Sequence, residues 1–298
     1  MKNTLLLIDG NAILHRAYHA LPALTDKRGR LVNAVYGFAS VLLKALREIK
    51  PKYIAAAFDL AEPTFRHKLF KAYKAKRVKA PQELYDQLPI IKKMLKAFNI
   101  PIFEKAGYEA DDIIGTISYQ LSVSSPCGEN RFAQSSYQSI KIIILTGDLD
   151  TLQLVNKNTQ ILTGLKDMTM YNEEKIQERY GLKPDQIVDF KALKGDPSDN
   201  IPGVPGIGEK TAIELLKKYK TLVNIYANLD SIKQSIRKKI EEQEEQAFFS
   251  KKLATIIHNV PIKFDLDKCV TEEYNKNKVI SFFQELGFKS LINRLERG

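Results

Sequence analysis

The sequence predicts an α/β fold with a mostly parallel sheet, followed by a mostly helical region. Three short apolar runs support the sheet: residues 5–8 end at Asp9, residues 53–58 end at Asp59, and residues 142–145 lead to Asp148. Such runs between polar segments are typical of strands buried on both faces of a parallel sheet. Helical patterns alternate with the runs, so we expect helices on both faces.

The elements are expected in this order along the chain. A helix follows Asp9, and apolar residues at helical spacing predict a helix over 35–46. Further expected elements are a helix at 84–98, a strand at 100–103, a helix bearing residues 109–112, and strands at 140–145 and 160–163. Beyond residue 171 the pattern is mostly helical, which predicts two parts, 1–183 and 184–298.

Residues 122–139 form a polar stretch rich in Ser and Gln, without apolar periodicity. Because the stretch separates an expected helix from an expected strand, it is interpreted as a surface loop that can be shortened at little entropic cost. Cys127 lies in it.

Composition narrows the class of protein. The 298 residues carry a net charge of +11 and a pI near 9.3, which favours a polyanionic partner such as nucleic acid. Cys127 and Cys269 are too few for a disulfide framework or a zinc site, which indicates a reducing, cytoplasmic setting. The first apolar run is too short for a signal peptide or a membrane span, so no membrane association is expected.

Acidic residues follow the predicted strands and recur in two further clusters. Parallel strands deliver the groups at their carboxyl ends to one edge of the sheet, where so many like charges would repel one another. Hard divalent cations relieve this repulsion, so the pattern predicts a site for two or more Mg²⁺ or Mn²⁺ ions. The nine carboxylates come from five places in the chain: Asp9, Asp59, Glu109, Asp111, Asp112, Asp148, Asp150, Asp196 and Asp199.

A basic segment directly follows Asp59. Residues 63–82 contain no acidic residue, and their Lys and Arg side chains are interleaved with Phe65, Phe70 and Tyr73. This composition suits contacts with a phosphate backbone and a stacked base. The predicted DNA contacts in this segment are Arg66, Lys71 and Tyr73.

A glycine-rich turn precedes a helical pattern at residue 209. Gly203, Gly206 and Gly208 allow backbone amides to approach a phosphate, and the following helix start favours an anion. Together with Lys210, the turn resembles the helix-hairpin-helix of sequence-independent DNA-binding proteins.

Five longer motifs resemble the five-prime nuclease domain of bacterial DNA polymerase I, within the flap endonuclease superfamily. They lie at residues 58–59, 63–67, 73–77, 107–112 and 195–203, and the similarity covers nearly the whole chain. The resemblance implies a PIN-like sheet, a helical arch at about 62–82 and a helix-hairpin-helix domain. Two departures are Leu149, where the family usually has Lys, and the longer 122–139 connection.

The resemblance also implies an activity: metal-dependent, structure-selective cleavage of five-prime flaps and removal of RNA primers. It identifies the nine carboxylates with metal ligands, Lys74 and Arg77 with arch residues at the scissile phosphate, and Tyr73 with base stacking. Implied partners are DNA with a flap, nick or primer and a fused or separate DNA polymerase, with a K⁺ ion at the hairpin and a monomeric bacterial protein at the nucleoid.

Two alternatives stay open. A PIN-type ribonuclease uses a similar but smaller carboxylate set, against which the hairpin and the Asp196/Asp199 pair argue. A non-catalytic DNA-binding module would have lost some carboxylates, and all nine are present.

Overall fold

The computed structural model describes residues 2–122, 140–165, 167–271 and 274–297. The expected loop at 122–139, including Cys127, lies outside these ranges except for Ser122, the last residue of a helix. Within the described ranges, no helix is both long enough and apolar enough to cross a lipid bilayer.

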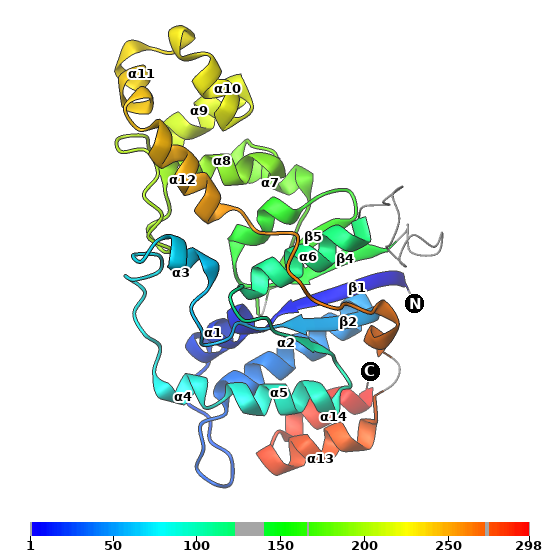
Figure 1. Ribbon diagram of the computed structural model, residues 1–298. Coiled ribbons are helices and arrows are strands. Elements are labelled where there is room, and N and C mark those ends of the chain that lie inside the picture. Colours follow the sequence, from blue (N-terminus) through cyan, green and yellow to red (C-terminus); the bar gives the residue numbers. More distant parts are fainter. Residues whose placement is uncertain (1, 123–139, 166, 272–273, 298) are drawn as a thin grey trace.

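One six-stranded sheet lies between layers of helices (Figure 1). Its order is β3-β2-β1-β4-β5-β6, and every pair is parallel except β5 with β6. The predicted strands are confirmed, whereas β6 was not predicted because only its pairing with β5 reveals so short a strand. The strands are β1 (Lys2–Asp9), β2 (Pro51–Ala57), β3 (Ile102–Phe103), β4 (Lys141–Leu145), β5 (Thr159–Thr163) and β6 (Thr169–Tyr171).

Successive side chains of β1 point to opposite faces of the sheet and so contribute to two separate core layers. Leu6 and Ile8 face one side of the sheet, where α1 (Gly10–Ala20), α2 (Asn33–Ile49) and α5 (Leu88–Ala97) cover them. Leu5 and Leu7 face the other side, under α6 (Ala110–Ser122). All four leucine and isoleucine side chains are almost fully buried, as expected for a central parallel strand.

The predicted helix at 84–98 is instead two helices, α4 (Gln82–Tyr85) and α5. The break has a physical reason: the buried Gln87 side chain accepts hydrogen bonds from Ala34 N at 2.8 Å and Val35 N at 3.3 Å. These amides belong to the first turn of α2 and have no partner within their own helix. Gln87 therefore links two helices.

The segment predicted as a helical arch, residues 62–82, is mostly turns. Its one helix is α3 (Phe65–Leu69), which begins at a capping box between Thr64 and His67. Turns and loop follow as far as α4, and the side chain of Val78 is 95% exposed. Dense like charge and the flanking Pro63 and Pro81 disfavour a longer helix here.

Residues 184–298, predicted as a second part, contribute to more than one apolar core. The helices of this region are α7 (Glu173–Tyr180), α8 (Ile187–Lys194), α9 (Glu209–Tyr219), α10 (Leu222–Ala227), α11 (Gln234–Glu241), α12 (Glu244–Ala254), α13 (Lys276–Leu286) and α14 (Lys289–Arg297), and 3₁₀ turns lie at Leu149–Leu154, Pro184–Gln186, Leu229–Ser231 and Leu266–Cys269. Helices α8 through α12 share a separate apolar core, and α9, α10 and α11 extend away from the sheet (Figure 1). The chain then returns: residues 256–269 enter the core under α6, and α13 and α14 pack on α5 and α2.

Candidate active site

The carboxyl edge of the sheet opens where the chain reverses its strand order. From β1 the chain adds β2 and β3 on one side and then β4 and β5 on the other. Open α/β sheets bind ligands in the crevice at such a switch point. Here the crevice is a cleft of about 830 Å³, and five of the nine predicted carboxylates line it: Asp9, Asp59, Glu109, Asp111 and Asp148.

Asp9 sits at the centre of this edge as the last residue of β1. One carboxylate oxygen accepts a hydrogen bond from Ala12 N at 3.0 Å and thereby caps α1, and the other accepts one from Thr146 Oγ1 at 2.6 Å. Thr146 follows β4, so the hydroxyl ties two neighbouring strand ends together. The side chain of Asp9 is held in one orientation before any ligand arrives.

Asp59 and Asp111 face each other across the start of α6. Asp59 Oδ1 accepts a hydrogen bond from Ala110 N at 2.7 Å, which caps that helix end. Asp111 Oδ1 is buried and has no hydrogen-bond partner in the described part of the chain. An orphaned buried carboxylate oxygen is costly and calls for a specific explanation.

The protonation equilibria reflect this crowding. Burial, with the charges of Asp59 and Asp148, raises the pKa of Asp9 to about 7, although two hydrogen bonds oppose the shift. Burial and the charges of Asp9, Asp148 and Asp59 raise the pKa of Asp111 well above its ordinary value. Burial also raises the pKa of Asp59. The cleft therefore concentrates negative charge that the protein alone does not neutralise.

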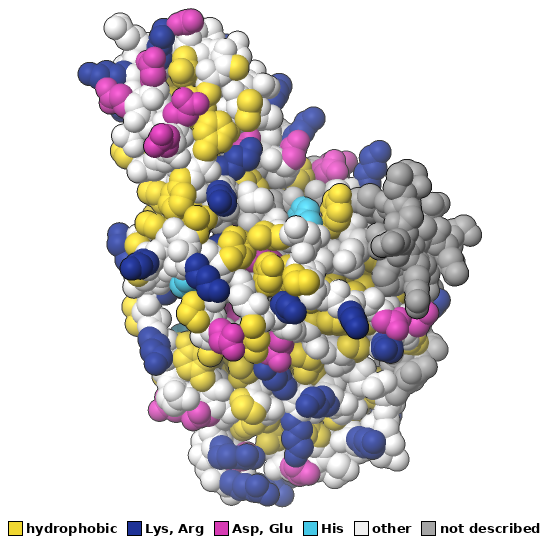
Figure 2. Space-filling view, viewed as in Figure 1, with side chains coloured by type: hydrophobic (Ala, Val, Ile, Leu, Met, Phe, Trp, Pro, Cys, Tyr) yellow, Lys and Arg dark blue, Asp and Glu magenta, His cyan; other side chains and the backbone are white. Residues whose placement is uncertain are grey.

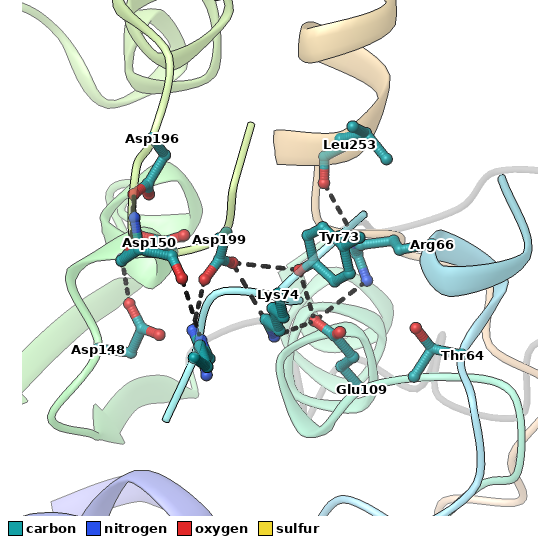
Figure 3. A network of polar contacts seen from close by, with 12 residues as sticks. Thr64, Arg66, Tyr73, Lys74, Glu109, Asp148, Asp150, Asp196, Asp199 and Leu253 are labelled. Carbon is teal, nitrogen blue, oxygen red and sulfur yellow. Dashed lines mark hydrogen bonds and ion pairs between the residues drawn. The ribbon is translucent and has the colours of Figure 1, made fainter. Parts of the chain in front are cut away.

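Three of the other four carboxylates form a second acidic group, Asp150, Asp196 and Asp199, and each is paired with a basic residue. Lys191 pairs with Asp150 and, at 2.7 Å, with Asp196. Arg77 pairs with Asp199, and Lys74 Nζ lies 3.0 Å from Glu109 and 3.9 Å from Asp199. Figure 3 shows this network between the arch segment and the strand ends.

Four arch residues predicted to contact substrate lie against carboxylates in this structure: Arg66, Tyr73, Lys74 and Arg77. The Tyr73 hydroxyl is 3.2 Å from Glu109 Oε2 and 3.1 Å from Asp199 Oδ2, and its side chain is buried. The Tyr73 ring is thus turned toward these carboxylates, and its stacking on a base stays a prediction. Two backbone links hold the arch here: Lys74 N donates to Asp199 O at 2.9 Å, and Asn200 Nδ2 donates to Ala72 O at 2.7 Å.

Arg66 was predicted to contact DNA, but its side chain is 97% buried. Its guanidinium forms a two-pronged pair with Asp112 at 2.7 and 2.8 Å and donates to the carbonyls of Leu253 and Thr255. Asp112 accepts a further hydrogen bond from Ile257 N at 2.9 Å. The pair holds the arch, α6 and the returning chain together, an arrangement that does not favour Asp112 as a metal ligand.

The glycine-rich turn connects α8 to α9. Gly203 and Gly206 have φ of 63° and 79°, which L-residues rarely adopt, and a Cβ at Gly203 would lie 2.2 Å from Gly195 N. Gly208 precedes the first residue of α9, and the next residue after Glu209 is Lys210, an exposed side chain. The arrangement leaves the N-terminus of an 11-residue helix facing solvent.

Several cleft residues were missed by the sequence prediction. His15, Arg16 and His19 lie on α1 and line the same cleft as the carboxylates, and Arg16 donates to Thr163 Oγ1 at 2.9 Å. Their helical spacing after the cap Asp9 was an available signal. Lys191 carried no local signal, because its position between Asp150 and Asp196 depends on how α8 docks.

The donor set fits hard divalent cations, since it consists of carboxylate oxygens, one of which is orphaned, and since burial raises the pKa of Asp9, Asp59 and Asp111. No three Asp, Glu, His or Cys side chains of the described ranges yet surround one point closely enough to hold an ion. Mutual repulsion and the pairing with Lys74, Arg77 and Lys191 account for this spacing.

In EDTA, the stability of the protein is expected to fall as pH rises from about 4 to 7. Burial first, then neighbouring acids, raises the pKa of Asp9 and of Asp150 from 3.8 to about 7. A raised carboxyl pKa contributes stability below pH 3.8 that is lost as pH rises through about 7. Urea melts from pH 5 to 8 would measure this; with Mg²⁺ the decline should be smaller, and an equal decline would contradict the assignment.

A cleft lined by carboxylates at the carboxyl edge of a parallel sheet, with a basic segment over it, defines a nuclease-type α/β protein. The family described as "5'-3' exonuclease, N-terminal resolvase-like domain" matches residues 4–181, and "5'-3' exonuclease, C-terminal SAM fold" matches residues 182–277. The chain belongs to the 5'-3' exonuclease family.

Curated relatives are similar in sequence, and solved structures are similar in fold. DNA polymerase I of Caldicellulosiruptor bescii is 45% identical over 98% of this chain, and that of Bacillus subtilis is 41% identical over 99%. The chain spans about a third of the length of these curated relatives, 33% and 32%. The fold resembles T5 5'-exonuclease with bound zinc (TM-score 0.64, 18% identity, 99% of this chain and 97% of that one) and the Rad2 catalytic core with DNA (0.58, 16%, 99% and 91%).

Proposed function

We propose that this chain is a divalent-metal-dependent, structure-selective nuclease that removes five-prime flaps and RNA primers from DNA. The observation that carries the proposal is the cleft, in which Asp111 has an unpartnered buried oxygen beside Asp9 and Asp148. Buried carboxylates that lie this close together are electrostatically unfavourable unless a cation binds between them. Such a set of oxygen ligands is expected of a site for Mg²⁺ or Mn²⁺.

Asp9, Asp59, Glu109, Asp111 and Asp148 would hold one ion in the cleft, and Asp150, Asp196 and Asp199 would hold another. Bound Mg²⁺ activates the nucleophile at neutral pH and neutralises charge on the attacked phosphate. Thr146 and Ala12 orient Asp9, and Ala110 orients Asp59, so the ligands need little rearrangement. Asp112 is proposed to support them through Arg66.

Lys74 and Arg77 are proposed to act on the scissile phosphate. Both line the cleft, and both are paired with carboxylates that the ions would take. Although burial opposes it, Glu109 and Asp199 raise the pKa of Lys74, so its ammonium stays charged near neutral pH. Once freed from these carboxylates, the two cations would stabilise charge on the phosphate.

The glycine-rich turn is proposed to bind duplex backbone without reading bases. Gly206 and Gly208 bring backbone amides to the start of α9, where the helix dipole favours a phosphate, and Lys210 adds charge. The turn is also proposed to bind a K⁺ ion. Lys and Arg side chains are also spread over the face shown in Figure 2, in keeping with the net charge of +11.

The arrangement of parts and partners completes the proposal. We retain residues 1–183 as the nuclease part and place DNA binding in the helices after residue 184, with the tail returning to the sheet. Because the relatives are bacterial DNA polymerases I about three times as long, a polymerase is the proposed partner, fused or separate. The chain is proposed to act as a monomer in the bacterial cytoplasm.

Digestion of an end-labelled flap duplex tests the function, with Mg²⁺ and with EDTA. The expected result is metal-dependent release of a short five-prime product with a five-prime phosphate. Single-stranded RNA in a parallel reaction separates this activity from a ribonuclease. Binding of the flap without cleavage in any metal would instead identify a non-catalytic DNA-binding module.

Lys74→Ala is expected to lower single-turnover flap cleavage by roughly 10²-fold or more, as for the loss of one preorganised donor. The reason is that its ammonium reaches a carboxylate of the cleft. It therefore lies near the phosphate that the bound ions would hold. Rapid-quench kinetics at saturating DNA measures the effect. Restoration of the full rate by saturating DNA would show that Lys74 only binds substrate.

Gly206→Asp tests the glycine-rich turn, which is proposed to bind DNA and not to act in cleavage. Its φ of 79° strains any side chain, and a carboxylate there would repel a phosphate. The variant should bind duplex more weakly while its rate on saturating DNA stays close to that of the wild type. A fall in the saturated rate alone would contradict the division of roles between arch and turn.

A further inference from the structure

Lys191 occupies a position that the proposed nuclease chemistry does not explain. It lies on α8, outside the sheet, yet its ammonium reaches between Asp150, which follows β4, and Asp196, which follows α8. The side chain is 13% exposed and hydrogen-bonds to Asp196 at 2.7 Å. These two carboxylates belong to a proposed cation site. The ammonium of Lys191 therefore puts a positive charge where a divalent cation would bind.

The two acidic groups differ in this respect. Of the five cleft carboxylates, only Glu109 takes part in ion pairs within the described ranges, with Lys74 and Arg66. Asp111 keeps an orphaned oxygen. In the second acidic group every carboxylate is paired: Lys191 pairs with Asp150 and Asp196, and Arg77 pairs with Asp199. Most of the first group therefore lacks a counter-charge, whereas the whole second group already has one.

We infer that Lys191 is a built-in counter-cation of the second acidic group and competes there with a divalent ion. Resting on the proposed function, this inference assigns the two groups different affinities. The first ion enters a group in which four of the five carboxylates have no ion-pair partner within the described ranges, whereas the second must displace the ammonium of Lys191. Lys191 is thus a positioning residue that sets the metal concentration at which the second ion binds.

The geometry around Lys191 allows the exchange. Asp196 is held independently, because its Oδ1 accepts hydrogen bonds from Ser198 N at 2.9 Å and Ser198 Oγ at 2.6 Å. Loss of the ammonium therefore leaves this carboxylate in place. The lysine stem is a flexible four-carbon chain with a strongly hydrated head, which can move to solvent without unfolding α8.

Calorimetric titration with Mn²⁺ tests the inference directly on the full chain. Lys191→Met keeps the length of the side chain and removes the charge, so the weaker ion should bind about tenfold more tightly or better. Lys191→Arg keeps a charge and should leave weak-ion affinity near that of the wild type. Lys194→Met is the matched control, because Lys194 lies on the same helix but pairs with Glu209, outside the second acidic group. It should leave the affinity for both ions unchanged.

Thermal melts provide a readout that does not depend on activity. In EDTA, Lys191→Met should melt lower than the wild type, because Asp150 and Asp196 lose their counter-charge. Saturating Mg²⁺ should remove most of that difference. An equal loss of melting temperature with and without Mg²⁺ would make Lys191 an ordinary structural ion pair and overturn the inference.

Amine labelling of the wild-type protein covers the case in which Lys191→Met does not fold. Acetylation of Lys191, read by mass spectrometry, should rise several-fold in saturating Mg²⁺ relative to EDTA, whereas Lys194 should not change. Protection of Lys191 that is the same in both conditions would overturn the inference. A wild-type chain that binds no Mn²⁺ would overturn the proposed function as well, which separates the two failures.

Discussion

Asp111→Asn is expected to abolish flap cleavage while leaving the protein in EDTA at least as stable as the wild type. The loss of cleavage should be at least about 10²–10³-fold, as for removal of one preorganised electrostatic group. Stability should not suffer because Asp111 Oδ1 has no hydrogen-bond partner to lose within the described chain. Removing the charge also relieves repulsion from Asp9, Asp59 and Asp148, the groups that, after burial, raise the pKa of Asp111.

Flap digestion and urea melts in EDTA at pH 8 measure the two halves of this prediction. Asp148→Asn should behave similarly in cleavage, since it lines the same cleft. The neighbouring Asp112→Asn is the informative control. Asp112 is paired with Arg66, so the same chemical change at this position should destabilise the protein. Strong destabilisation of Asp111→Asn in EDTA would show that Asp111 serves the fold, not a cation.

Arg66→Met is expected to destabilise the protein by about 3–5 kcal/mol, the usual cost of removing one partner of a buried ion pair. Asp112 is 0% exposed and would lose the guanidinium that pairs with it. The carbonyls of Leu253 and Thr255 would lose their donors at the same time. Equilibrium urea unfolding gives the change in the free energy of unfolding.

Lys68→Met on the same short helix is the matched control and should fall within about 0.5 kcal/mol of the wild type, because its side chain is exposed. If Arg66→Met were as stable as this control and only bound DNA more weakly, Arg66 would be a surface contact, as the sequence had predicted. The two variants thus distinguish a structural arginine from a substrate-binding one.

The central architecture could be predicted from the sequence, because local pattern determines it. The apolar runs before Asp9, Asp59 and Asp148 are long enough to be strands and too apolar for a one-sided sheet. Strand direction then places their carboxyl ends at one edge, so the cleft acids were predictable before their distances were known. The glycine-rich turn was equally readable, since only glycine tolerates its positive φ values cheaply.

Only the tertiary structure decided what each charged side chain does, because a pairing partner distant in the chain leaves no local pattern. Arg66 and Lys71 look alike in sequence, yet Arg66 is buried against Asp112, 46 residues away, and Lys71 is exposed. Lys191 meets Asp150 only because α8 docks on the turn after β4. The return of α13 and α14 to the sheet likewise depends on long-range packing of apolar faces. Sequence alone determined where the carboxylates gather, and three-dimensional packing determined which of them already have a counter-charge.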